Sequence, residues 1–137
     1  MKIMVDTNII ISALVFGGQA EKILHILFES EHNLYISEYI DKEIAEVLKR
    51  KWPEKALELY SAYRKMNFNF CTSTNLTLAT LRDIKDIPIL NDAIYHNIDV
   101  ILSGDKDFLE TDLTKPLICS PTTMLNFLHS QQNRHNL

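Results

Sequence analysis

The stretch KIMVDTNIIISALV, residues 2–15, carries the pattern that decides the fold. It begins with a short apolar run, residues 2–5, that is typical of a buried strand. Asp6 follows at once, and Thr7 or Asn8 can cap a helix over the remaining apolar residues. A short apolar strand that leads directly into a helix is the first half of the crossover unit from which parallel sheets are built.

The same alternation of short apolar strands and helical segments continues along the chain. The predicted strands cover residues 2–5, 33–37, 67–73, 99–103 and 116–119. The predicted helices cover residues 7–15, 19–30, 38–52, 54–66, 86–97 and 121–129. Strands that are apolar throughout are typical of a parallel sheet with helices on both faces. We therefore expect an α/β fold, a three-layer α/β/α sandwich around a central, mainly parallel sheet of about five strands.

The composition is that of an ordinary globular domain. The 137 residues, 46% of them hydrophobic and 23% charged, favour one domain over residues 1–129 and a polar, flexible tail over residues 130–137. No apolar run reaches the roughly 18 residues that a membrane helix needs, and Asp6 and Asn8 interrupt the apolar run near the N-terminus. We therefore expect a cytoplasmic protein with no membrane partner. The formal net charge of −4 does not exclude nucleic acid, because local basic patches can still hold phosphates.

Two of the predicted strands are followed by aspartates. Asp6 comes directly after the first strand, and Asp105 follows the strand over residues 99–103 after a single glycine, with Asp107 just beyond it. In open α/β sheets, ligands bind outside the carboxyl ends of the strands. We therefore expect Asp6 and Asp105 to lie at the same edge of the sheet.

Two further acids lie where they can join this edge. Glu43 is on the flank of the apolar stripe of the helix over residues 38–52, where a carboxylate either has a compensating partner or extends to water. Asp86 stands two residues before a proline at the start of a predicted helix, where it can also act only as a cap. Asp83 and Asp92 are nearby alternatives, and Asp92 is expected at the surface or in a local hydrogen bond.

Several carboxylates in one place need a cation or bound protons. Two carboxylates about 4 Å apart repel by roughly 4 kcal/mol at an effective dielectric constant of about 20. A site made only of oxygen ligands favours Mg²⁺ or Mn²⁺, and these ions assist phosphodiester hydrolysis. The chain has no glycine-rich P-loop, no G-x-S-x-G motif and no G-x-G-x-x-G motif, so other phosphate chemistries lack support.

Four segments, in this order and spacing, resemble the PIN domain family. They are MVDTNIIISAL (residues 4–14), YISEYIDKEIAEVL (residues 35–48), DIPILNDAI (residues 86–94) and DVILSGDKDF (residues 99–108). The resemblance extends over nearly the whole chain and is greatest to stand-alone prokaryotic PIN proteins grouped as toxins of toxin–antitoxin pairs. It implies a PIN-like fold and an Mg²⁺- or Mn²⁺-dependent endoribonuclease that acts on single-stranded RNA. It also implies a homodimer and a cognate antitoxin protein as partners.

The resemblance further assigns residues to the site. The acids for catalysis and for binding one or two ions fall on Asp6, Glu43, Asp86 and Asp105. Asp107 falls on a weaker fifth position of this set. Among the basic residues, Lys106 is the candidate RNA contact because it is next to Asp105 in the sequence. The small polar residues of the family site fall on Asn8, which would orient Asp6, and on Ser103, where threonine is usual. The implied reaction is metal-assisted hydrolysis that leaves 5′-phosphate and 3′-hydroxyl ends.

Alternatives to a toxin remain open at this point. A PIN nuclease can act in RNA processing or decay, and a PIN-like module can bind RNA or a partner without cleaving. A response-regulator receiver or a haloacid-dehalogenase-like phosphatase is disfavoured, because Asn8 stands where a second acid would be needed. For the homodimer, the helix over residues 54–66 offers Tyr60, Tyr63 and Met66 as a contact face.

Overall fold

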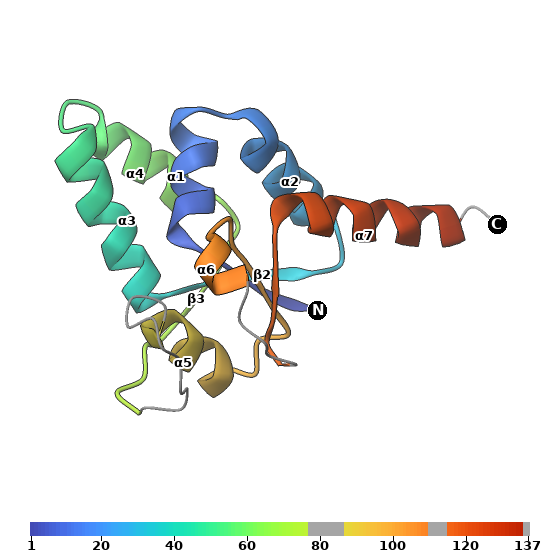
Figure 1. Cartoon of the computed structure of the whole chain (residues 1–137). Helices are drawn as coiled ribbons and strands as arrows, with labels where there is room; N and C mark the ends of the chain where they lie inside the picture. The colour runs from blue at the N-terminus through green and yellow to red at the C-terminus, as the bar shows by residue number, and fades with distance from the viewer. Residues whose placement is uncertain (77–86, 110–114, 136–137) are drawn as a thin grey trace.

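The computed structural model describes residues 1–76, 87–109 and 115–135 of the chain (Figure 1). Its strands are β1 (Lys2–Val5), β2 (Asn33–Ser37), β3 (Asn69–Cys71), β4 (Val100–Leu102) and β5 (Leu117–Cys119). Its helices are α1 (Thr7–Val15), α2 (Gly18–Phe28), α3 (Glu38–Lys51), α4 (Ala56–Arg64), α5 (Ile87–Tyr95), α6 (Lys106–Leu109) and α7 (Pro121–His135). Each predicted strand is present, whereas the one-turn helix α6 was not predicted.

The strands form a single sheet in the order β3-β2-β1-β4-β5, and the neighbouring strands are parallel. β1 lies at the centre, between β2 and β4. The pairing of Val5 with Leu102 makes β1 and β4 end side by side, and Ser37 of β2 pairs with Cys71 of β3 in the same way. The carboxyl ends of these strands therefore form one edge of the sheet.

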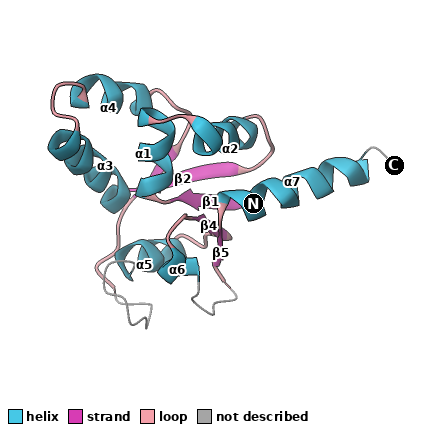
Figure 2. Ribbon diagram, turned by 45° about the horizontal axis from the view of Figure 1, so that its top comes forward, coloured by secondary structure: helices cyan, strands magenta, loops and turns pink. Residues whose placement is uncertain are grey.

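Helices cover both faces of this sheet. Figure 2 shows α1, α2, α3 and α4 on one side and α5 and α6 on the other. On the first side, α1 packs against α2, α3 and α4, and α2 also contacts α7. The predicted three-layer α/β/α sandwich is confirmed.

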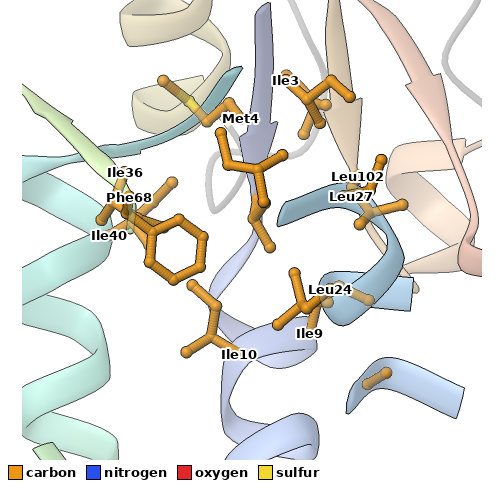
Figure 3. Close-up of a cluster of buried hydrophobic side chains, with 14 of the residues drawn as sticks. Ile3, Met4, Ile9, Ile10, Leu24, Leu27, Ile36, Ile40, Phe68 and Leu102 are labelled. Atoms are coloured by element: carbon orange, nitrogen blue, oxygen red, sulfur yellow. The ribbon is translucent and has the colours of Figure 1, made fainter. Parts of the chain in front are cut away.

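The core between the sheet and the first layer of helices is mainly aliphatic. Figure 3 shows Phe68 beside Ile36 of β2, Ile10 of α1 and Ile40 of α3, close to Met4 of β1. All five side chains are buried. Because burial of such a side chain contributes about 1.5–3 kcal/mol, this packing holds α1 and α3 firmly against the sheet, and with them the polar residues near their N-terminal ends.

The N-cap of α1 and the end of α7 differ from the sequence interpretation, whereas the ends of the other predicted helices lie within two residues of the expected positions. The N-cap of α1 is Asp6, whose side chain accepts a hydrogen bond from the N–H of Thr7, so neither Thr7 nor Asn8 is the cap. α7 continues to His135, beyond the predicted end at residue 129. The segment after residue 129 is polar but contains no proline or glycine, and its glutamines and arginine are good helix formers.

The contact face suggested for a homodimer is also different from the prediction. Tyr63 is fully buried, and its hydroxyl donates to Asp41 at 2.8 Å. The hydroxyl of Tyr60 donates to the same carboxylate at 3.1 Å. These tyrosines therefore join α4 to α3 within one chain, and Tyr63 cannot contribute to an exposed dimer face.

None of the described helices is by itself long and apolar enough to cross a membrane. Within the described part of the chain, only α1 and α2 taken together have the length and apolar composition of a membrane span, and the chain bends by 108° at their junction. Most of the apolar residues of this pair are buried in the core.

Candidate active site

The carboxyl ends of β1 and β4 carry two of the predicted acids. Asp6 follows β1, and its N–H donates to the carbonyl of Leu102 at 3.0 Å, so the pairing with β4 extends to this residue. Asp105 follows β4 after Ser103 and Gly104 and caps α6, because its carbonyl accepts the N–H of Leu109 at 2.9 Å. Asp6 is buried, with 5% of its surface exposed, and Asp105 is half-buried. Both acids lie at the same edge of the sheet.

Ser103 joins these two acids. It is fully buried, and its hydroxyl donates to Oδ2 of Asp6 at 2.8 Å. The hydroxyl oxygen of Ser103 also accepts a hydrogen bond from the backbone N–H of Asp105 at 3.1 Å. The negative charge of Asp6 determines the direction of the hydroxyl proton, which leaves the lone pairs of Ser103 for Asp105. A single side chain therefore links the carboxylate of Asp6 to the backbone of Asp105.

Thr7 connects Asp6 to Glu43, a contact that the sequence did not predict. Its N–H donates to Oδ1 of Asp6 at 2.7 Å, and its hydroxyl donates to Oε1 of Glu43. Thr7 is buried, with 3% of its surface exposed, and Glu43 is half-buried on α3. Glu43 therefore faces the sheet edge and does not extend fully into water. The sequence does show a hydroxyl residue directly after the strand-end aspartate, which could have indicated this contact. In the sequence, however, Thr7 fitted the role of a helix cap equally well.

The electrostatics of Asp6 reflect first its burial and then its hydrogen bonds and the neighbouring acids. Burial is the largest effect and raises the pKa of Asp6 above its ordinary value. The hydrogen bonds from Ser103 and Thr7 lower the pKa, and the negative charges of Glu43 and Asp105 raise it again. The net result is a raised pKa. Ionised Asp6 is thus unfavourable in the protein alone, and a positive charge nearby would relieve the penalty.

The donor set suits a hard divalent cation in its chemistry. The three acids supply carboxylate oxygens, the ligands that Mg²⁺ and Mn²⁺ prefer, and each oxygen of Asp6 keeps a lone pair besides its one hydrogen bond. Within residues 1–76, 87–109 and 115–135, however, no three His, Cys, Asp or Glu side chains are grouped closely enough to hold an ion. The described acids therefore fit a cation in kind, but they do not by themselves form a complete set of ligands.

The raised pKa of Asp6 makes stability depend on pH in a definite direction. In the folded protein Asp6 keeps its proton above its ordinary pKa of 3.8. Its contribution to stability is complete below that pH and is lost as the pH rises through the folded pKa. In EDTA, we expect Asp6→Asn to gain free energy of unfolding relative to the wild type as the pH is raised from about 4 to about 7. Urea unfolding at each pH measures this difference.

Asp99→Asn is the matched control for this titration. Asp99 lies before β4, at the opposite edge of the sheet, where it accepts the N–H of Lys2 at 2.8 Å. A difference between Asp6→Asn and the wild type that stays constant or falls with pH would contradict the expected effect.

The remaining predicted residues are not placed in this cluster. Asn8 is exposed, and among the described residues its side chain makes no hydrogen bond to Asp6, whose oxygens are bound by Thr7 and Ser103. Thr7 and Ser103, and not Asn8, therefore make the contacts that orient Asp6. Lys106 is exposed at the start of α6. Asp86 and the side chain of Asp107 lie outside the described part of the structure.

Comparison with known proteins agrees with the fold and with the positions of these motifs. The PIN domain family model matches residues 2–107. "Uncharacterized protein MJ1680" of Methanocaldococcus jannaschii is 32% identical over 117 residues, which cover 80% of this chain and 74% of that protein. A solved structure of VapBC2 from Rickettsia felis, bound to a DNA fragment from its promoter, contains a similar chain with a TM-score of 0.70 and 15% identity.

The structural match covers 88% of this chain and 98% of the Rickettsia chain, and at this level of identity it concerns the fold alone. The family match is different in kind, because it includes the residues after β1 and β4 that form the sheet edge described above. This chain belongs to the PIN domain family, a family of nucleases.

Proposed function

We propose that this chain is an Mg²⁺- or Mn²⁺-dependent endoribonuclease that hydrolyses phosphodiester bonds of single-stranded RNA. One observation carries the proposal. Glu43 and Asp105, from two other segments, lie near Asp6 at the carboxyl edge of the sheet, where burial, and to a smaller extent the charges of these two acids, raise the pKa of Asp6. Such a cluster is costly to the fold without a cation, and acids with perturbed pKa values gather at functional sites.

Each residue has a proposed part in this reaction. Asp6, Glu43 and Asp105 hold one or two cations, together with Asp86 and Asp107 as the ligands predicted from the sequence. Thr7 orients the carboxylates of Asp6 and Glu43, and Ser103 orients that of Asp6, through the hydrogen bonds described above. A bound divalent cation supplies the positive charge that acidifies water and stabilises the oxyanions of phosphodiester hydrolysis. Lys106, which follows Asp105 and is exposed, is the residue that we propose binds a phosphate of the RNA backbone.

Cleavage of a labelled single-stranded RNA by the purified protein tests the proposal. We expect cleavage in Mn²⁺ or Mg²⁺, none in EDTA, and products with 5′-phosphate and 3′-hydroxyl ends. Products with 2′,3′-cyclic phosphates would contradict metal-assisted hydrolysis. A single-stranded DNA of the same sequence, run in parallel, determines whether the substrate is RNA alone. Metal uptake without cleavage of the RNA or of the DNA would contradict the choice of substrate but not the metal site.

Thr7→Val is expected to weaken Mn²⁺ affinity by about tenfold, because it removes the hydroxyl that holds Glu43 while keeping the volume of the side chain. Calorimetric titration measures the change. Thr7→Ser keeps the hydroxyl and should retain most of the affinity. Equal affinities of the valine variant and the wild type would show that Glu43 needs no support from Thr7.

We further propose that the nuclease acts as the toxin of a toxin–antitoxin pair, with a cognate antitoxin protein as its partner. The likeness to a chain of a VapBC2 complex supports this assignment. Induced expression of the wild type in a bacterial host should arrest growth, and Asp6→Asn should not. Unaffected growth, with RNA cleavage intact in vitro, would favour a role in RNA processing or decay. The homodimer stays a prediction that light scattering can test.

A further inference from the structure

Asp92 is a buried carboxylate that the proposed site does not use. It lies on α5 with 1% of its surface exposed. Its Oδ2 accepts a hydrogen bond from the hydroxyl of Ser73 at 2.7 Å, and its Oδ1 accepts the N–H of Thr74 at 2.8 Å. Both partners follow β3 at the same sheet edge as Asp6. The expectation of a surface position or a local bond was wrong, because these bonds join segments 18 and 19 residues apart.

Ser73 continues this connection to the first turn of α3. Its hydroxyl proton goes to Asp92, and its oxygen accepts the backbone N–H of Tyr39 at 2.9 Å. The N–H of Ser73 donates in turn to Oε1 of Glu38 at 3.2 Å. The first N–H groups of a helix have no acceptor within the helix, so an acceptor supplied from outside determines where the helix begins. Asp92 and Ser73 together therefore tie the N-terminal end of α3 to α5.

We propose that Ser73 and Asp92 are positioning residues that hold the N-terminal end of α3 and thereby set the place of Glu43 at the sheet edge. Glu43 follows Tyr39 by four residues, so it lies on the same side of α3 one turn further along. Thr7 binds its carboxylate from α1. The inference rests on the proposed function, because it concerns the position of a proposed metal ligand.

The arrangement repeats the one around Ser103. In both places a serine hydroxyl donates to a buried aspartate of another segment and also accepts a backbone N–H, from Asp105 two residues further on in one case and from Tyr39 of α3 in the other. In both places the carboxylate charge orients the hydroxyl and strengthens its hydrogen bond. Loss of the hydroxyl removes one bond from the carboxylate and one from the N–H, which loosens the connection between the two segments.

Mn²⁺ affinity of purified full-length variants tests the inference, with free Mn²⁺ followed by electron paramagnetic resonance. We expect Ser73→Ala to weaken binding by about tenfold, at the lower end of the effect of outer contacts on metal affinity. Ser73→Thr keeps the hydroxyl and should restore binding. Ser61→Ala, at an exposed position of α4, is the matched control and should bind as the wild type does.

Two further variants separate positioning from general loss of structure. Asp92→Asn should weaken binding to a similar extent, and it serves if Ser73→Ala does not fold. In a Glu43→Gln background, Ser73→Ala should cause no further loss, because it acts through Glu43. Wild-type affinity of folded Ser73→Ala, or an equal loss in both backgrounds, would overturn the inference. Wild-type affinity of Glu43→Gln alone would overturn the proposed metal site, and the inference with it.

Discussion

Asp6→Asn is expected to lower the rate of RNA cleavage by about 1,000-fold, a loss of about 4 kcal/mol of transition-state stabilisation. Asparagine keeps the shape of the side chain but removes the charge of the most buried acid of the cluster. Asp6 is also the acid that Ser103 and Thr7 hold in place, so no neighbouring carboxylate can take its position. Initial rates at saturating Mn²⁺ measure the loss.

Asp99→Asn controls for the removal of a carboxylate as such. It changes the same residue type at the opposite edge of the sheet and should leave the rate within about twofold of the wild type. Near-ultraviolet circular dichroism of both variants shows whether the fold is retained. A folded Asp6→Asn protein with more than about a tenth of the wild-type rate would contradict the assignment of Asp6.

Ser103→Ala is expected to lower the rate by about 100-fold, the upper end of the effect of outer contacts on a metal site. The variant removes one of the two hydrogen bonds to the Asp6 carboxylate and the acceptor for the N–H of Asp105. One substitution therefore removes a contact to the Asp6 carboxylate and a contact to the backbone of Asp105. For this reason the expected effect exceeds that of Thr7→Val. Part of the loss should appear as a higher Mn²⁺ concentration for half-maximal rate.

Ser103→Thr is the matched variant, because it keeps the hydroxyl. Its rate should lie within about tenfold of the wild type. If the threonine variant is as slow as the alanine variant, packing at this fully buried position is responsible and not the hydrogen bonds.

The topology and the main acids were predictable because each depends on a local pattern. Continuous apolar strands predicted the parallel sheet, and residues that follow parallel strands meet at one edge, so Asp6 and Asp105 could be placed together from the chain alone. The helical period put Glu43 on the flank of the packing face of α3 and left its direction open, and the resemblance to the PIN domain family assigned it to the site.

The contacts that orient the acids were not predictable in the same way. Consecutive residues of a helix point about 100° apart, so the register at the start of α1 decides whether Thr7 or Asn8 faces inward. Only the cap formed by Asp6 settles that register, with Thr7 buried and Asn8 exposed. Asp92 depends on a serine that follows a different strand, and no local pattern relates the two.

The most direct test of a metal site at this sheet edge is a Mn²⁺ titration of the wild type and of Asp105→Asn, with Asp99→Asn beside them. We expect saturable binding to the wild type and to Asp99→Asn, and binding at least about tenfold weaker to Asp105→Asn. Equal binding to all three proteins would contradict the proposal that the acids after β1 and β4 hold the cation.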